Sequence, residues 1–254
     1  MKSLENAHAF ITGGGTGIGA AIATRLGKSG ARITVAGRRL EPLHEVAESL
    51  PEGHAVSLDV TDEVSVEGGL SAARERFGPV DVLINNAGAA TSAPFARTTT
   101  DVWRAMVEVN MTGTFLVSRA VLAEMVERGR GRIVNVASTA GLAGYPYIAA
   151  YCAAKHGVVG MTRSLALEVA REGVTVNAVC PGYTETGLLS DSVANIVEKT
   201  GMDEEEARAA LVRTNPQGRF VTPEEVAEAV AWLVGPNSGA VTGQSISVSG
   251  GEVT

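Results

Sequence analysis

A tyrosine and a lysine four positions apart carry the first chemical signal in this sequence. In a helix, Tyr151 and Lys155 would lie one turn apart on the same face. Two charges ~4 Å apart at an effective dielectric near ~20 interact by about 4 kcal/mol. An interaction of that size predicts a lowered tyrosine pKa, from ~10 towards ~7 at the most, and solvent access would make the shift smaller. Such a phenol can exchange a proton with a carbonyl or an alcohol. Ordinary helices also contain a tyrosine and a lysine at this spacing, so the other motifs must show whether the pair is catalytic.

A glycine-rich turn near the start of the chain predicts a nucleotide-phosphate site. The apolar run 7–12 leads into Thr12-Gly13-Gly14-Gly15-Thr16-Gly17-Ile18-Gly19, and a helical pattern follows at once. Glycines let a pyrophosphate approach the backbone, and a helix N-terminus supplies N–H groups and partial positive charge. The spacing differs from the commonest GxGxxG fingerprint, and no lysine follows as in a P-loop. A turn without a ligand is the alternative. The candidate contacts are Gly13, Gly15, Thr16, Gly17, Ile18 and Gly19.

Two arginines after the second predicted strand bear on which dinucleotide binds. The strand 32–36 ends at Gly37, where an acidic residue would hold the ribose hydroxyls of NAD. Arg38 and Arg39 follow instead, and guanidinium groups pair with a 2′-phosphate in a forked geometry. The sequence therefore favours NADP(H), with NAD(H) as the open alternative. Two solvated arginines at the start of a helix would explain the pattern without any ligand.

A further acidic residue follows the third predicted strand, 55–58. Asp59 has two readings: it accepts a hydrogen bond from the adenine amine, or it caps the helix that begins near Asp62. Val60 follows it directly. Both residues come after a strand, as the glycine turn does. Ligands of α/β proteins bind at this end of the strands, so Asp59 and Val60 are candidate cofactor contacts.

Strands and amphipathic helices alternate along the whole chain. Near-continuous apolar runs predict further strands at 80–84, 131–137, 174–180 and 245–248, and the pattern at 101–128 predicts one long helix. Apolar strands separated by helices are typical of a parallel sheet covered on both faces. We expect a single doubly wound α/β domain over residues 1–254, with helices after Asp203 and Thr222, which are suitable N-caps.

Composition narrows the class of protein. The net charge of −7 and the pI of about 5.2 argue against nucleic acid as a partner. No apolar run is long enough for a membrane span, and the first ten residues lack the apolar core of a signal peptide. Cys152 and Cys180 have no metal-site spacing and are expected to be buried packing residues. We expect a cytoplasmic enzyme without a metal.

Six motifs occur in an order that resembles the short-chain dehydrogenase/reductase family, in its soluble branch of about 250 residues. They are Thr12-Gly13…Gly17-Ile18-Gly19, Asn85-Asn86-Ala87-Gly88, Asn110, Ser138, Tyr151-xxx-Lys155 and Pro181-Gly182-Tyr183-Thr184-Glu185-Thr186. The resemblance implies a Rossmann-type domain with seven parallel strands, an NAD(P)-dependent oxidoreductase and usually a homotetramer. Within the family, the chain looks similar to 3-oxoacyl thioester reductases and bacterial polyketide ketoreductases.

The resemblance also implies roles for individual residues. Tyr151 would protonate the developing alkoxide, while Ser138 would hold the oxygen. Lys155 would lower the tyrosine pKa and bind the nicotinamide ribose. Asn110 would perturb its helix, and its backbone would hold a water that resupplies the proton. The further cofactor contacts that it implies are Asn86, Ala87, Gly88, Tyr151, Lys155, Pro181, Gly182, Thr184 and Thr186. Thr184 departs from the apolar residue usual at its place.

The segment 187–218 resembles the family's mobile substrate lid. Its apolar residues favour a medium-sized hydrophobic ketone, with a thioester among the candidates. Arg128, Arg130 and Arg171 would attract an acidic carrier protein near the mouth of the site, or are ordinary surface charge. The helical stretch 157–169 is apolar around much of its girth, which suggests a subunit interface or burial against its own sheet.

Three functions remain open from the sequence. The first is an NADP(H)-dependent carbonyl reductase that acts on a 3-oxoacyl thioester or on a cyclic or aryl ketone. The second is an NAD-dependent dehydrogenase of a secondary alcohol or a hydroxy acid. The third is a dinucleotide-sensing protein without turnover, which would be expected to lack Tyr151 or Lys155.

Overall fold

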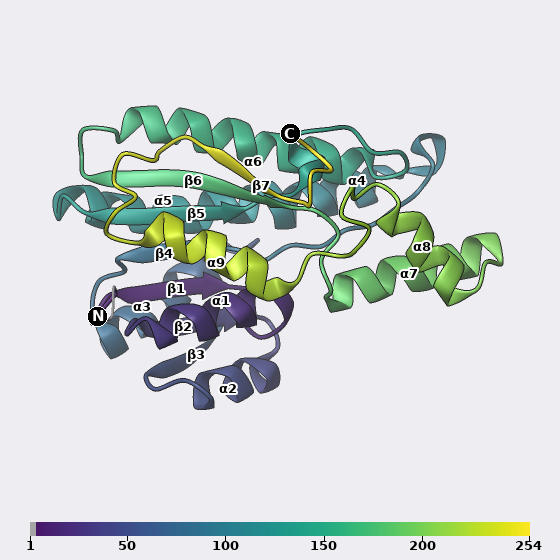
Figure 1. Ribbon diagram of the computed structural model, residues 1–254. Coiled ribbons are helices and arrows are strands. Elements are labelled where there is room, and N and C mark those ends of the chain that lie inside the picture. Colours follow the sequence, from purple (N-terminus) through teal and green to yellow (C-terminus); the bar gives the residue numbers. More distant parts are fainter. Residues whose placement is uncertain (1–3) are drawn as a thin grey trace.

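A computed structural model describes residues 4–254, so the first three residues of the predicted domain lie outside it. Seven parallel strands form one sheet in the order β3-β2-β1-β4-β5-β6-β7, which confirms the predicted parallel α/β architecture (Figure 1). The strands are β1 (His8–Thr12), β2 (Arg32–Gly37), β3 (Gly53–Ser57), β4 (Val82–Asn85), β5 (Gly131–Val136), β6 (Val174–Pro181) and β7 (Ser245–Val248). Most bounds agree closely with the apolar runs.

Helices pack on both faces of this sheet. The helices are α1 (Gly17–Lys28), α2 (Leu40–Glu48), α3 (Glu63–Phe77), α4 (Thr100–Val107), α5 (Gly113–Glu127), α6 (Ala149–Glu168), α7 (Gly187–Thr200), α8 (Glu204–Val212) and α9 (Pro223–Val234). One apolar core joins α1, α2 and α9 to the sheet, and a second joins α3, α5 and α6 to the other face (Figure 1). All residues of β1 and β6 are buried, as expected for strands covered on both sides.

The helix predicted over 101–128 forms, with the perturbation at Asn110 that the family resemblance implies. It is interrupted by a π-helical turn, Glu108–Thr112, between α4 and α5. At its centre Asn110 is fully buried, although it lies in an otherwise apolar pattern. π-helical turns inside α-helices are rare and frequently occur at functional sites. Gly113 lets α5 begin close to the loop that follows β3, because a Cβ there would lie 2.7 Å from Cγ2 of Val60.

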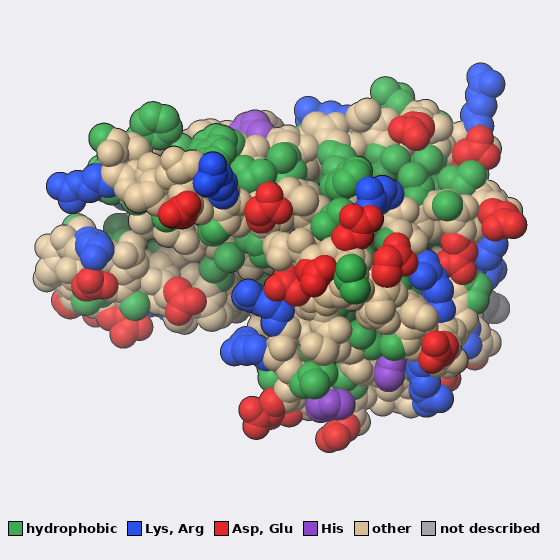
Figure 2. Space-filling model, turned by 180° about the vertical axis from the view of Figure 1, so that it is seen from behind, with side chains coloured by type: hydrophobic (Ala, Val, Ile, Leu, Met, Phe, Trp, Pro, Cys, Tyr) green, Lys and Arg blue, Asp and Glu red, His purple; other side chains and the backbone are tan. Residues whose placement is uncertain are grey.

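The predicted lid forms two helices, α7 and α8, which project from the carboxyl end of the sheet (Figure 1). Leu189 and Val193 of α7 pack against Ala207 and Phe220 in a small core of their own. Many of the apolar lid residues that were expected to face a substrate therefore pack against one another inside the lid. Seen from behind, a hollow separates this lobe, at the lower left, from the loops above it (Figure 2).

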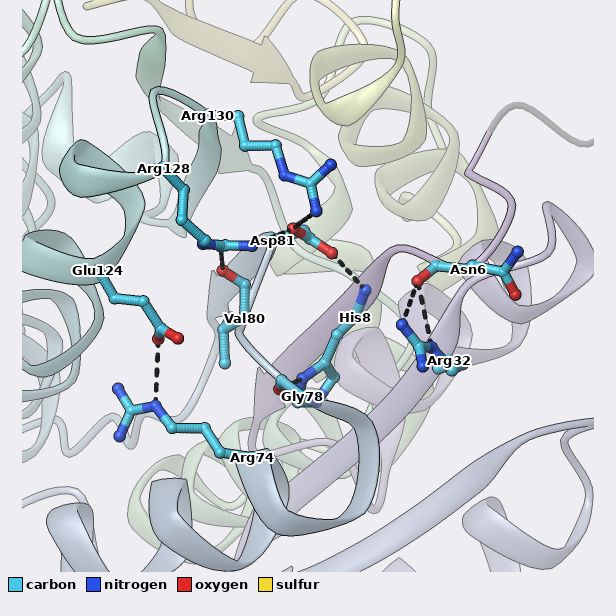
Figure 3. A network of polar contacts seen from close by, with 10 residues as sticks. All are labelled: Asn6, His8, Arg32, Arg74, Gly78, Val80, Asp81, Glu124, Arg128 and Arg130. Carbon is cyan, nitrogen blue, oxygen red and sulfur yellow. Dashed lines mark hydrogen bonds and ion pairs between the residues drawn. The ribbon is translucent and has the colours of Figure 1, made fainter.

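Arg128 and Arg130 lie at the amino ends of the strands, so the prediction that they flank the mouth of the site is wrong within this chain. The carboxylate of Asp81, just before β4, pairs with Arg128 at 2.8 Å and with Arg130 at 3.0 Å (Figure 3). Arg128 also donates to the carbonyl oxygen of Val80. Arg171 is exposed just before β6 begins, which places it at the same edge. Ligands bind at the opposite edge of such a sheet.

Between residues 4 and 254, the structure contains no helix with both the length and the apolar character needed to cross a membrane. The same residues bring no three His, Cys, Asp or Glu side chains together as a metal site.

Candidate active site

Two turns meet where the strand order reverses, between β1 and β4. The Thr12 hydroxyl oxygen accepts hydrogen bonds from the backbone N–H groups of Asn86 and Ala87, both at 3.0 Å. The Asn86 amide donates to the carbonyl oxygens of Thr12 and Gly13, also at 3.0 Å. These bonds join the glycine turn after β1 to the asparagine turn after β4. Such a switch point is the usual ligand crevice of a doubly wound sheet.

The glycine turn has the shape that a pyrophosphate requires. Gly13 has a φ of 64°, and a Cβ there would lie 2.9 Å from Nδ2 of Asn86. A Cβ on Gly19 would lie 2.2 Å from the carbonyl oxygen of Gly13. The helix α1 begins after Thr16 without a side-chain cap, and uncapped N–H groups at a helix start favour an anion. The residues present therefore fit the phosphates of a dinucleotide.

Thr186, in the segment that follows β6, contacts the same turn at the carboxyl edge of the sheet. A Cβ on Gly17 would lie 3.0 Å from the methyl group of Thr186, which stands just before α7. Thr184 is buried and forms an isolated parallel bridge with Val221. The structure thus brings together motifs that are far apart in the sequence.

Arg38 and Arg39 lie exposed just after β2, and Arg38 is near Asp59. Neither guanidinium forms an ion pair within the part of the chain that the structure describes. Hydrogen bonds from Thr61 hold the pKa of Asp59 below its usual range, and the charge of Arg38 adds to this effect. The alternative that Asp59 caps the next helix is wrong, because the carboxylate of Asp62 accepts from Val64 N–H there.

The helix α6 carries Tyr151 and Lys155 one turn apart, as the spacing predicts. The lysine is buried, and its Nζ donates to the carbonyl oxygen of Val136 in β5 at 2.9 Å. The same Nζ lies 5.6 Å from the centroid of the Tyr151 ring. Ser138 follows β5 and its Oγ accepts from Ala140 N–H at 3.1 Å, which leaves the hydroxyl proton free to be donated.

The prediction of a lowered tyrosine pKa is wrong for this chain. Burial raises the pKa of Tyr151 to about 12, although the nearby Ser138 hydroxyl acts in the opposite direction. Burial also lowers the pKa of Lys155 to about 8. The prediction assumed two charges in a partly solvated setting. Here the interior disfavours both charged forms, and the lysine ammonium is directed to a backbone carbonyl.

Asn110 links the π-helical turn to the loop after β4. Its amide donates to the carbonyl oxygens of Ala89 at 2.9 Å and Met106 at 3.0 Å, and its Oδ1 accepts from Ala89 N–H at 3.3 Å. A Cβ on Gly88 would lie 2.7 Å from this Oδ1 and 3.7 Å from Nζ of Lys155. Asn110 therefore lies close to the lysine, with its side chain holding the loop.

Three residues beside this site were not among the predicted site residues. They are Tyr145 in the loop before α6, Tyr183 after β6 and Glu252 in the C-terminal tail; the Tyr145 hydroxyl donates to Oε1 of Glu252 at 2.8 Å. Burial raises the pKa values of both Tyr145 and Tyr151, and the neighbouring Tyr183 adds a smaller effect in the same direction. Tyr183 lies within the motif 181–186, whereas no local pattern marks Tyr145 or Glu252, which are 107 positions apart in the chain. Cys152 and Cys180 are free and buried, which confirms that they are packing residues.

Comparison with known proteins identifies relatives of the whole chain. The family model for short chain dehydrogenases matches residues 7–196. The crystal structure of a single-residue variant of actinorhodin polyketide ketoreductase with NADPH is similar, with a TM-score of 0.94 and 43% identity, over 99% of this chain and 98% of that one. The 3-oxoacyl-[acyl-carrier-protein] reductase FabG of Vibrio cholerae is 38% identical over 98% of both chains. The 2-(S)-hydroxypropyl-CoM dehydrogenase 3 of Xanthobacter autotrophicus is 39% identical, over 98% and 97%.

Proposed function

This chain belongs to the short-chain dehydrogenase family, and from that premise we propose that it is an NADPH-dependent reductase of a ketone. Membership makes it an NAD(P)-dependent oxidoreductase that acts on CH–OH and keto groups. The observation that carries the finer proposal is the grouping of Ser138, Tyr151 and Lys155 at the carboxyl ends of β5 and its neighbours, on the side of the sheet where the glycine turn lies.

The coenzyme would be held by residues that the two turns and the end of β2 present. The pyrophosphate would be surrounded by Gly13, Gly15, Thr16, Gly17, Ile18, Gly19 and Thr186. The 2′-phosphate would pair with Arg38 and Arg39, and the adenine would contact Asp59 and Val60. The nicotinamide half would contact Asn86, Ala87, Gly88, Pro181, Gly182 and Thr184. When bound, the nicotinamide supplies the hydride. Lys155, buried beside Gly88, would bind the nicotinamide ribose.

The side chains of the site would supply the proton and hold the substrate. A phenol with a pKa of about 12 stays protonated at neutral pH, so Tyr151 is a proton donor to the alkoxide that forms from the ketone. The free hydroxyl proton of Ser138 would be donated to the same oxygen. Lys155 and the backbone of Asn110 would pass a replacement proton to Tyr151 through water.

For the substrate, we propose a 3-oxoacyl thioester or a cyclic or aryl ketone. Support comes from the names of the relatives, which include a polyketide ketoreductase and a 3-oxoacyl carrier-protein reductase. An NAD-dependent alcohol dehydrogenase is the second candidate, favoured by the relative that is a hydroxypropyl-CoM dehydrogenase. A sensing protein without turnover has less support, because both Tyr151 and Lys155 are present.

Substitution of Tyr151 by Phe tests the proposed function. With a panel of 3-oxoacyl thioesters, cyclic ketones and aryl ketones, NADPH oxidation by Tyr151→Phe is expected to fall by about 100-fold or more, because general acid catalysis contributes about that much. Coenzyme affinity, followed by NADPH fluorescence, should change little. The matched control is Tyr147→Phe, since that side chain is exposed. Undiminished turnover by Tyr151→Phe would refute the role of this acid.

We also propose a cytoplasmic homotetramer in which α5 and α6 form an interface. Leu167 of α6 is 82% exposed and Phe115 of α5 is 45% exposed, so both present apolar surface at the outside of a single chain. Burial of such side chains favours association. Light scattering should give a mass near four chains for the wild type and a smaller mass for Leu167→Glu. A wild-type monomer would contradict this assembly.

A further inference from the structure

The C-terminal tail returns to the site and places a carboxylate there. After β7, Glu252 lies against the turn that follows β6, where a Cβ on Gly182 would be 2.7 Å from Oε2 of the carboxylate. Its other oxygen, Oε1, accepts the hydrogen bond from the Tyr145 hydroxyl at 2.8 Å. The Oε2 atom is buried and has no hydrogen-bond partner among residues 4–254.

Tyr145 connects this tail to the reacting groups. It lies in the loop between Ser138 and Tyr151, and its hydroxyl is also within reach of Thr139, which follows Ser138. Tyr183 is the neighbour that Tyr145, Glu252 and Tyr151 have in common. The Glu252 carboxylate therefore contacts the loop that lies between two of the proposed catalytic residues, Ser138 and Tyr151.

A carboxylate is unusual at the position of Glu252 if the side chain serves only to pack the C-terminal tail against the domain. A buried polar oxygen without a partner lowers stability, which an apolar side chain at the same place would avoid. The benefit of the carboxylate is a charge-assisted hydrogen bond, stronger and more directional than a neutral one. Such a bond restricts the Tyr145 ring to one position in a loop that has no regular structure between Leu142 and Ile148.

We propose that Glu252 is a positioning residue that holds Tyr145 against the substrate site and thereby sets which ketones are accepted. The proposal rests on the proposed reductase function and adds a determinant of its selectivity. A bulky ketone must compete with the fixed Tyr145 ring for space, whereas a small ketone profits from it. Loss of the bond would let the ring move away and widen the site.

Steady-state kinetics with one small cyclic ketone and one bulky aryl ketone tests this role. Glu252→Ala and Tyr145→Phe should each shift the ratio of kcat/KM values towards the bulky ketone by about tenfold, the size expected for one hydrogen bond to a charged group. The change should lie in KM, with kcat nearly unchanged. Glu252→Gln should keep the ratio between those of the wild type and Glu252→Ala, because its amide oxygen still accepts from Tyr145 but carries no charge. The control is Tyr147→Phe, an exposed tyrosine in the same loop.

Thermal unfolding of the wild type, the two single variants and the double variant measures the contact without any substrate. The double variant should be no less stable than the worse single variant, because both remove the same bond. Additive shifts in the unfolding midpoint would overturn the proposal, as would an unchanged kcat/KM ratio in a protein that still reduces ketones. If the wild type reduces no ketone at all, the proposed function fails as well, so the two failures are distinct.

Discussion

Tyr151 shows how strongly a single residue depends on what surrounds it. Its spacing from Lys155 suggests mutual stabilisation of charge, yet the interior raises the pKa of the phenol to about 12 and lowers that of the lysine to about 8. A protonated phenol is suited to donate a proton during ketone reduction. The reverse reaction needs the phenolate, which a pKa this high disfavours at neutral pH. At the scale of the residue, the surroundings of Tyr151 therefore set the protonated form from which the proposed ketone reduction starts.

Coenzyme preference is also decided by single residues, and Arg38→Asp is the variant that tests it. Loss of one pairing with a phosphate and gain of a repelling carboxylate should raise the KM for NADPH by about 10- to 100-fold, as expected for about 1.5–3 kcal/mol. The KM for NADH should change much less. Steady-state kinetics with both coenzymes gives the ratio. An equal change for both coenzymes would contradict the assignment of Arg38 to the 2′-phosphate.

The control for this variant is Arg171→Asp, which makes the same change of charge at an exposed position. Arg171 lies at the opposite edge of the sheet, before β6. Its substitution should leave the ratio of the two KM values as in the wild type. A general loss of positive charge is thereby separated from a local contact.

At the scale of the element, the helices differ in how they are held. The helix α9 contributes Val226, Val230 and Leu233 to the main core. The lid helix α8 contributes Ala207 to a small separate core. Both begin with a capping box, formed by Thr222 with Glu225 and by Asp203 with Glu206. Their different packing gives the same local motif different consequences for stability.

Removal of the two caps should separate local from global unfolding. Asp203→Ala and Thr222→Ala each lose a capping hydrogen bond, which contributes about 0.5–2 kcal/mol. For α9 this loss should lower the midpoint of global thermal unfolding, because the helix belongs to the main core. For α8 it should instead speed amide hydrogen exchange in 204–212 with little change in the midpoint. Equal effects of the two variants on the midpoint would show that the lid unfolds together with the sheet.

At the scale of the whole molecule, the two edges of the sheet have opposite characters. The carboxyl edge holds the open turns of the proposed active site, whereas the amino edge is joined by polar contacts around His8 and Asp81 (Figure 3). The buried His8 ring contacts the carbonyl oxygen of Gly78 and the Thr34 hydroxyl. Burial lowers the pKa of His8, an effect to which Arg32 adds and which the Gly78 carbonyl and Asp81 oppose. This edge contributes to stability rather than to catalysis.

His8 should make the stability of the fold depend on pH. In the unfolded chain a histidine takes up a proton as the pH falls through ~6.5, whereas the folded chain resists protonation. The unfolded state then binds more protons, so the free energy of unfolding should fall by up to ~1.4 kcal/mol per pH unit below ~6.5. Urea unfolding at several pH values should show a weaker dependence for His8→Gln. The exposed His44→Gln is the control and should behave as the wild type.

The sequence by itself determined the elements, their order and the motifs. Apolar runs predict the strands because a strand buried on both faces excludes polar side chains, and the glycines predict the turn because only glycine fits there. Tyr151 and Lys155 share a helix face because helical spacing is local. These features depend on neighbours within a few residues, which a sequence displays directly.

Only the tertiary structure decided which distant groups meet and how deeply they are buried. It placed Arg128 at the amino edge, brought Glu252 to Tyr145 and gave the perturbation at Asn110 the form of a π-helical turn. It also reversed the predicted direction of the Tyr151 pKa, because desolvation depends on every element packed around a group and not on its spacing from one charge. Contacts between residues far apart in the chain leave no periodic signal, so packing alone reveals them.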